Sequence, residues 1–218
     1  FLGTGSTLVA CYNSNRLGIG IELQEKYATI ARERLKILES QLKLDSDGSS
    51  MKAKQLVLQG NSADINRLWE VYNLPLVDLV ITSPPYGPML NKKGLVTKER
   101  EEEGLDLKYS DDVSDLGNAS GYDDFLVKLM QIFAEIKGKV KEGGYVVVIL
   151  QNYMDKGEYK MLAWDFAREM TKHFQLRGER VWCFHPETIV WTSQGGKKIK
   201  DINIGDSVLT HKGIFGEV

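Results

Sequence analysis

The stretch VDLVITSPPY, residues 77–86, decides how this chain of 218 residues folds. Its first part is a short apolar run, which is typical of a buried strand in a parallel sheet. Pro84 and Pro85 end that strand, because neither can donate a ladder hydrogen bond and each fixes its own φ. Ser83 and Tyr86 flank this stiff corner. Ligands of open α/β sheets bind at the carboxyl ends of strands, so the corner is the first candidate for a functional site.

Strands and helices alternate on both sides of this stretch. The apolar patterns predict further strands at residues 16–22, 55–58, 145–150 and 176–182. They predict helices at residues 7–12, 24–42, 65–71, 122–140 and 159–173. Gly143 and Gly144 are expected to stop the helix that begins at residue 122, and a further strand is expected before Phe1. The alternation indicates an α/β fold with a doubly wound, mostly parallel sheet.

The composition excludes several classes of protein. A net charge of −2 gives no electrostatic sign of a nucleic-acid partner, although a basic face could be offset by acidic segments elsewhere. The two cysteines, Cys11 and Cys183, lie far apart, which suits a reducing cytoplasm and disfavours a disulfide framework. No apolar run is long enough to cross a membrane, and no metal-ligand spacing is present.

A glycine loop and an acidic strand end indicate a cofactor site. Gly3 and Gly5 lie in FLGTGST, residues 1–7, and Glu22 ends the following strand, where it can accept hydrogen bonds from ribose hydroxyls. Leu8 replaces the third glycine of the dinucleotide fingerprint, and no GK[ST] of a nucleoside triphosphate site follows. S-adenosylmethionine needs no pyrophosphate cradle, so the shorter turn fits it better.

Together these residues resemble the DNA amino-methyltransferases, which methylate an exocyclic nitrogen of cytosine or adenine. FLGTG resembles the cofactor loop of that family, GIGIE its acidic strand, GNSAD its adenine-side loop and TSPPY its catalytic motif. The motifs occur in the family's order, and the resemblance covers residues 1–182. It implies that S-adenosylmethionine is held at its methionine part by Phe1, Gly3 and Gly5, at its ribose by Glu22 and at its adenine by Asn61 and Ser62.

The catalytic motif suits the chemistry of a nucleobase amine. The lone pair of such an amine is delocalised into the ring, so acceptors that hold its protons favour attack on the methyl donor. Within SPPY, the Ser83 hydroxyl and the Pro84 carbonyl can serve as acceptors, and Pro85 stiffens the corner. Tyr86 can stack on a base flipped out of the DNA duplex. The corner offers no cysteine nucleophile of the carbon-5 type.

The substrate remains open on the sequence alone. In the family that the chain resembles, Ser at the first motif position is usual for cytosine N4, and Asp or Asn for adenine N6. We therefore favour cytosine N4 and keep adenine N6 as the alternative. An RNA or protein substrate, or a nucleotide-binding module without catalysis, also fits these residues. Residues 87–120 show no periodicity, which indicates a long loop, and we assign it no chemistry.

Residues 183–218 differ in sequence pattern from the rest of the chain. They show alternating, hairpin-like patterns without a helical period, which predicts a second, all-β domain. The segment resembles the first block of an intein of the Hint type, truncated after its first strands. The resemblance implies that the thiol of Cys183 attacks the carbonyl of Trp182 and converts that amide into a thioester. A small β appendage or a target-reading module is the alternative.

Overall fold

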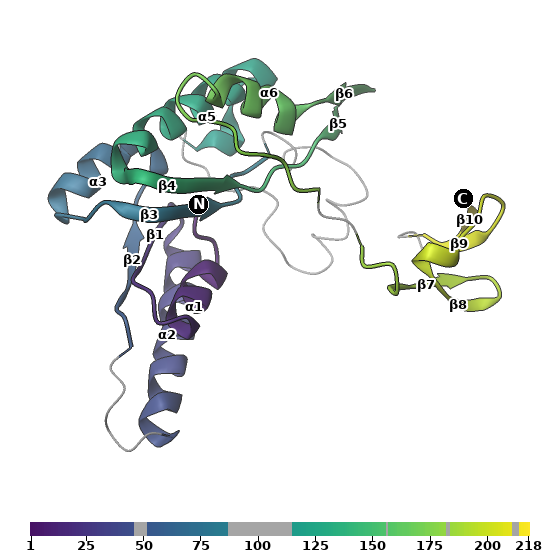
Figure 1. Ribbon diagram of the computed structural model, residues 1–218, viewed down its shortest axis with the longest axis horizontal. Helices are drawn as coiled ribbons and strands as arrows, with labels where there is room; N and C mark the ends of the chain where they lie inside the picture. Colours follow the sequence, from purple (N-terminus) through teal and green to yellow (C-terminus); the bar gives the residue numbers. More distant parts are fainter. Residues whose placement is uncertain (46–51, 87–114, 156, 182–183, 211–213) are drawn as a thin grey trace. The chain divides into compact units, whose positions relative to one another are not determined.

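The computed structural model describes residues 1–45, 52–86, 115–155, 157–181, 184–210 and 214–218. The chain divides into two compact units, the first being Phe1–Leu176 and the second Arg177–Val218 (Figure 1). The first unit contains α1 (Ser6–Asn13), β1 (Gly18–Glu22), α2 (Glu25–Asp45), β2 (Gln55–Gln59), η1 (Ser62–Asp64), α3 (Ile65–Val71), β3 (Val77–Thr82), η3 (Leu116–Asn118), α5 (Tyr122–Ile136), η4 (Lys137–Lys139), β4 (Val140–Val148), β5 (Tyr153–Asp155), β6 (Glu158–Lys160) and α6 (Leu162–Met170). The second unit contains β7 (Ile189–Thr192), β8 (Gly195–Lys198), η5 (Ile199–Asp201), β9 (Ser207–Leu209) and β10 (Phe215–Glu217).

Parallel strand pairs form the centre of the first unit. β1 pairs with β2, and β3 pairs with β4, each in parallel register. The start of the chain lies next to both pairs: Leu2 N donates to Ile21 O at 2.9 Å, and the Thr82 hydroxyl donates to Phe1 O at 3.3 Å. The described ladders therefore form two short parallel sheets, where the sequence predicts one continuous sheet.

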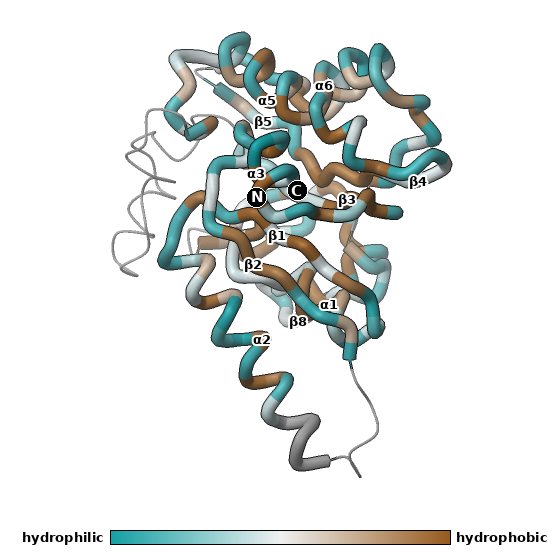
Figure 2. The backbone as a smooth tube through the Cα atoms, turned by 90° about the vertical axis from the view of Figure 1, so that its left-hand side faces the viewer, coloured by the Kyte–Doolittle hydropathy of each residue, from teal (hydrophilic) through white to brown (hydrophobic). Residues whose placement is uncertain are grey.

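Helices cover the two strand pairs from different sides. α1 and α2 pack on β1 and β2 through a small cluster around Leu8, Tyr12 and Leu35. Figure 1 shows α5 and α6 on the other side of the strands, beside β4, where Phe133 and its neighbours form the main core. Figure 2 shows hydrophobic stretches along the strands and alternating colours along α2, as expected for a helix with one buried face.

Glycines in β1 allow this close packing. A Cβ on Gly18 would lie 2.6 Å from a Leu8 methyl group, and a Cβ on Gly20 would lie equally close to Leu2. The side chains of α1 and of the first loop therefore occupy the space that larger strand residues would fill. This contact fixes the glycine loop against the end of β1.

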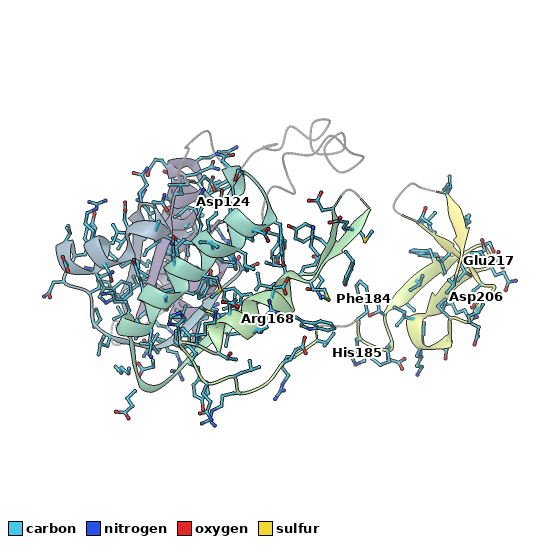
Figure 3. All side chains as sticks on the ribbon, turned by 90° about the horizontal axis from the view of Figure 1, so that it is seen from above. Asp124, Arg168, Phe184, His185, Asp206 and Glu217 are labelled. Atoms are coloured by element: carbon cyan, nitrogen blue, oxygen red, sulfur yellow. The ribbon has the colours of Figure 1, made fainter. Side chains whose placement is uncertain are left out.

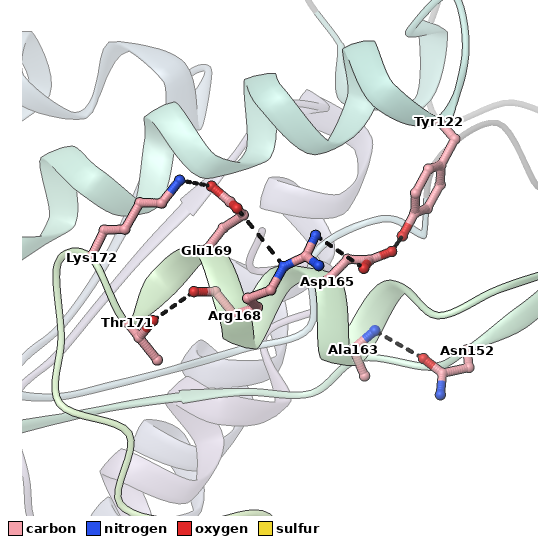
Figure 4. Close-up of polar contacts among 8 residues, drawn as sticks. All are labelled: Tyr122, Asn152, Ala163, Asp165, Arg168, Glu169, Thr171 and Lys172. Atoms are coloured by element: carbon pink, nitrogen blue, oxygen red, sulfur yellow. Dashed lines mark hydrogen bonds and ion pairs between the residues drawn. The ribbon is translucent and has the colours of Figure 1, made fainter.

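A polar network joins α5 to α6. Figure 3 labels Asp124 on α5 and Arg168 on α6, and Figure 4 shows the contact between Tyr122 and Asp165 that joins the two helices, together with polar contacts within and beside α6. The Tyr122 hydroxyl donates to an Asp165 carboxylate oxygen at 2.6 Å, and Arg168 lies 3.6 Å from the same carboxylate. Burial, followed by the hydrogen bond to Asp165, raises the pKa of Tyr122, so the phenol stays protonated as the donor. Asn152 accepts the Ala163 N–H at 2.9 Å at the start of α6.

Several predicted elements and boundaries are wrong. The helix predicted at residues 122–140 ends at Ile136, and β4 begins at Val140 because Val140 pairs with Val77. Gly143, with φ +76°, lies inside β4, where the register with β3 shifts. The helix predicted from residue 159 begins at Leu162, because the preceding residues form the β5–β6 hairpin. The strand predicted at residues 176–182 has no ladder in its described part, residues 176–181.

The second unit is an antiparallel sheet in the order β10-β9-β7-β8. The Lys197 ammonium lies 2.7 Å from the Asp206 carboxylate, and Lys198 and Lys200 both pair with Glu187. Figure 3 labels Asp206 on this unit. The unit begins six residues before the boundary expected at residue 183. In the described part of the whole chain, none of the helices combines the length and hydropathy of a bilayer span.

Candidate functional site

A cleft of about 510 Å³ lies at the carboxyl ends of β1 and β3. Its walls come from the glycine loop, the ends of β1 and β2 and the proline corner that follows β3, with further residues from α2, from the start of η3 and from the end of β4. Nine of the ten residues predicted for the cofactor and catalytic sites line it: Phe1, Gly3, Glu22, Asn61, Ser62, Ser83, Pro84, Pro85 and Tyr86. The tenth, Gly5, does not line the cleft and packs instead against Ala31 of α2. The volume is in the range of pockets that hold drug-sized ligands.

The glycine loop has a conformation that favours glycine at two positions. Gly3 has φ +59° and Gly5 φ +84°, both in the left-handed region. A Cβ on Gly5 would lie 2.8 Å from the Cβ of Ala31, whereas the space beside Gly3 is open. Arg34 donates to the carbonyl oxygen of Thr4 at 2.7 Å and holds the loop from outside the cleft. Gly5 thus packs the loop on α2, and Gly3 leaves room beside the cleft.

Glu22 lies at the end of β1 and is 9% exposed. Its Oε2 accepts the Gly3 N–H at 2.7 Å, and its Oε1 accepts the Gln24 N–H at 3.1 Å. These bonds fix the carboxylate between the glycine loop and the start of α2. A carboxylate has about four acceptor sites, so it can still accept hydrogen bonds from two ligand hydroxyls.

Asn61 and Ser62 line the cleft and also hold the backbone. The Asn61 side chain accepts the Ala63 N–H at 2.9 Å and caps η1. The Ser62 hydroxyl oxygen accepts from the Phe1 backbone nitrogen at 3.2 Å, and the same nitrogen donates to Ile21 O at 2.8 Å. The start of the chain and the end of β2 are thereby joined at the wall of the cleft.

The proline corner presents Ser83 to solvent and buries Pro84. The hydroxyl groups of Ser83 and Tyr86 lie 2.9 Å apart, a contact that the sequence did not predict. Tyr86 is half-buried and packs against the main core. A serine hydroxyl has two lone pairs, so when it donates to Tyr86 it remains an acceptor for a substrate amine.

Sequence reasoning missed several residues of the cleft, of which Asp115 is the most important for its charge. Asp115 lies in the stretch to which we assigned no chemistry, and it is 6% exposed. Its Oδ1 accepts the Gly117 N–H at 2.8 Å at the start of η3. The order Asp-Leu-Gly-Asn marks a turn of this type, but only the fold brings it to the proline corner.

The charge of the cleft restricts its ligand. Among the described residues that line it, Glu22 and Asp115 are acidic, and none is Lys, Arg or His. This wall disfavours phosphate groups and favours a ligand that carries positive charge. Within the described residues, no group of three His, Cys, Asp or Glu side chains is placed to hold a metal ion.

The two cysteines differ in what the structure describes of them. Cys183 and its neighbour Trp182, the predicted splice junction, lie outside the described residues. Cys11 lies on α1 as a free thiol, and burial raises its pKa, with Arg16 opposing the shift. A raised pKa disfavours the reactive thiolate at Cys11.

Comparison with known proteins gives little further information. No family model matches the chain. A 36-residue segment, 16% of this chain, is 50% identical to part of the ATP-dependent DNA helicase Hel308 of Thermococcus kodakarensis. The match spans only 3% of that helicase, so it does not assign an activity to either unit.

Proposed function

We propose that the first unit is an S-adenosylmethionine-dependent DNA methyltransferase with a doubly wound fold, acting on the exocyclic N4 of cytosine. One observation supports this most: the cleft that contains Gly3 and Glu22 also contains Ser83 and Tyr86. The motifs are separated by up to 80 residues in sequence. A proline turn without a function would have no reason to meet a glycine loop and a buried acid in one cleft.

The charge of the cleft favours S-adenosylmethionine over other nucleotide-like ligands. Its sulfonium is positive, whereas dinucleotides and nucleoside triphosphates bring phosphates to a wall that contains Glu22 and Asp115. When bound, it supplies an activated methyl group, so no covalent intermediate on the protein is required. Glu22 would accept hydrogen bonds from its ribose hydroxyls, and Asn61 with Ser62 would lie at its adenine.

The proline corner then orients the substrate amine. The Ser83 hydroxyl and the Pro84 carbonyl accept hydrogen bonds from its two protons, which favours the pyramidal nitrogen that attacks the methyl group. Tyr86 replaces the stacking that a flipped base loses on leaving the duplex. The packing of Tyr86 on the core and its contact with Ser83 keep both groups in place before the base arrives.

Two substitutions of Tyr86 test this function in the full chain. Tyr86→Ala should abolish methyl incorporation into DNA but leave S-adenosylmethionine binding, measured by calorimetry, within about twofold, since it removes only the stacking ring. Tyr86→Phe is the matched control, because it keeps the ring and loses only the hydroxyl that contacts Ser83. Donor binding by a wild-type chain that methylates neither DNA nor RNA nor protein would favour a nucleotide-binding module without catalysis.

The methylated nucleoside in the product DNA decides whether cytosine or adenine is the substrate base. Digestion of methylated DNA to nucleosides, followed by mass spectrometry, should yield N4-methylcytosine. If N6-methyladenine is the sole product, the adenine alternative replaces the cytosine assignment. A reducing cytoplasm, where DNA and the methyl donor meet, is the compartment that we propose, and the wide separation of Cys11 and Cys183 in sequence agrees with it.

We further propose that residues 183–218 are the first segment of an intein that interrupts the methyltransferase. The support is that a compact antiparallel unit begins at Arg177, after the last helix of the first unit. The Cys183 sulfur would form a bond to the Trp182 carbonyl carbon as the amide C–N bond breaks, and the released nitrogen would take up the thiol proton. In the full-length gene, Cys183→Ala should accumulate an unspliced precursor. If the Cys183→Ala gene gives a product of the same size as the wild-type gene and no precursor accumulates, the intein proposal is rejected.

A further inference from the structure

The two halves of the cleft belong to separate strand pairs. The glycine loop and Glu22 lie at the end of β1, which pairs with β2, whereas the proline corner follows β3, which pairs with β4. Among the described residues, no ladder joins β1 to β3. The separation between the two halves must therefore be set by other contacts.

Phe1 is held between the two strand pairs. Its backbone nitrogen donates to Ile21 O of β1 at 2.8 Å and to the Ser62 hydroxyl at 3.2 Å. Its carbonyl oxygen accepts from the hydroxyl of Thr82, the last residue of β3, at 3.3 Å. Phe1 and Thr82 both line the cleft. The Thr82 hydroxyl thus connects the cofactor half of the cleft to the catalytic half.

The backbone around Thr82 is fixed on both sides. Thr82 O accepts the N–H of Ile149, the residue that follows β4, at 2.9 Å. The β-branched side chain of Thr82 has few χ1 rotamers, so its hydroxyl holds one direction. Ser83 follows directly, and the buried Pro84 stiffens the next step of the chain. A displacement of Thr82 would therefore be passed on to the proposed acceptors of the substrate amine.

We propose that Thr82 is a positioning residue, whose hydroxyl sets the distance between the methyl donor and the substrate amine. This inference rests on the proposed methyltransferase function. In the transfer, the amine lone pair forms the new N–C bond, the electron pair of the methyl C–S bond stays on sulfur, and the nitrogen releases one proton to solvent. Such a displacement needs the nitrogen and the methyl carbon about 3 Å apart and in line with the sulfur.

A positioning role predicts a loss of rate without a loss of donor binding. Glu22 accepts from the Gly3 and Gln24 N–H groups, so the donor half of the cleft is held together without Thr82. Removal of the Thr82 hydroxyl should leave that half in place and let the proline corner shift against it. A misplacement of about 1 Å can cost about a hundredfold in rate, so we expect a smaller shift to cost about tenfold.

Three variants of the full chain test this role. Thr82→Val removes the hydroxyl and keeps the shape of the side chain, whereas Thr82→Ser keeps the hydroxyl and should rescue the rate. Thr171→Val is the matched control: the Thr171 hydroxyl also donates to a backbone oxygen, Arg168 O at 2.6 Å (Figure 4), but Thr171 does not line the cleft. Melting temperatures show whether each variant folds, and Thr82→Ala replaces Thr82→Val if that variant does not.

The rate of methyl transfer is measured in a single turnover on long, unmethylated duplex DNA, and donor affinity is measured by calorimetry with S-adenosylmethionine. Thr82→Val should lower the rate at saturating donor about tenfold and leave the affinity within about twofold. Thr82→Ser and Thr171→Val should keep both values within about twofold of the wild type. An unchanged rate in Thr82→Val, an equal loss in Thr82→Ser, or a parallel loss of donor affinity would overturn the inference and leave the methyltransferase proposal intact. A wild-type chain that transfers no methyl group to DNA would overturn both.

Discussion

The two described units of this chain bury very different amounts of apolar surface. In the first unit, α5 and α6 supply side chains such as Phe133 and Phe166 that are almost fully buried. In the second unit, Thr192 is the only buried residue among those described, and it is polar. Trp191 is 62% exposed on the sheet. The first unit therefore has its own core, and the described part of the second unit does not.

The difference in buried apolar surface indicates what stabilises each unit. Apolar burial is the main favourable term in folding, and the first unit has it in two clusters. The second unit relies on its ladders and on exposed or half-buried ion pairs such as Lys197–Asp206, which contribute little. Small sheets need a packed face for independent stability.

Separating the units should give the largest effect. A chain of residues 1–176 should melt cooperatively and bind S-adenosylmethionine as the full chain does, because the core and the cleft are both within it. A peptide of residues 177–218 should show the narrow amide dispersion of an unfolded chain in NMR spectra. A well-dispersed spectrum for the peptide would contradict the comparison.

A matched pair of aromatic truncations, one in each unit, should sharpen the comparison between the units. Phe133 is fully buried, and its ring contacts Phe166 edge to face with centroids 4.9 Å apart. Phe133→Ala should lower the free energy of unfolding of the first unit by about 3–5 kcal/mol. Trp191→Ala removes a larger ring from the second unit, yet we expect no change in that unfolding transition. Urea denaturation followed by circular dichroism measures both.

A pair of glycine substitutions gives an intermediate effect. Gly5 and Gly205 both have positive φ, but only Gly5 has a close neighbour, the Cβ of Ala31 at 2.8 Å. Gly5→Ala should cost about 2–4 kcal/mol, because left-handed strain and overpacking add. Gly205→Ala should cost about 1 kcal/mol from strain alone. Denaturation measures the loss of unfolding free energy caused by Gly5→Ala. For Gly205→Ala we expect NMR shift changes confined to the neighbourhood of residue 205.

The sequence predicted local patterns well and long-range ones less well. The strands that begin at Gln55 and Val77 lie where the apolar runs placed them, because a short apolar run bounded by turns has few alternatives. The burial predicted for the second of these strands is wrong, since Leu79 is 53% exposed and Ile81 is 41% exposed. The predicted end of α5 is wrong, because residues 137–140 continue the helical period in the sequence. In the structure Val140 instead pairs with Val77 and begins β4. Tertiary pairing overrode local propensity there.

The same limit applies to the cleft. The four motifs are local, so each could be found in the sequence, and their residues line one cleft. Asp115 was missed because nothing local marks it as part of that cleft, and its neighbours fit an ordinary turn. The contact between the Ser83 and Tyr86 hydroxyls was missed as well, since it depends on the shape of the proline corner.

The smallest expected effect compares one carboxylate from each unit. The Lys128 ammonium and then the Ser120 N–H lower the pKa of Asp124, and Lys197 and then the Asn203 N–H lower the pKa of Asp206. A lowered folded-state pKa gives stability that is present above the unfolded value, 3.8, and is lost as the pH falls through the folded value. Carboxyl NMR titration of the full chain should therefore find both groups ionised below that pH.

The stability consequence should differ between the units. Asp124→Asn should flatten the decline in unfolding free energy of the first unit as the pH falls below about 4, since the variant has no proton to take up there. Asp206→Asn should leave that decline unchanged, because its carboxylate belongs to a unit whose described part has no apolar core and which therefore has no share in that transition. If Asp206→Asn flattens the curve as much as Asp124→Asn does, the two units unfold as one cooperative body, and the contrast between them is wrong.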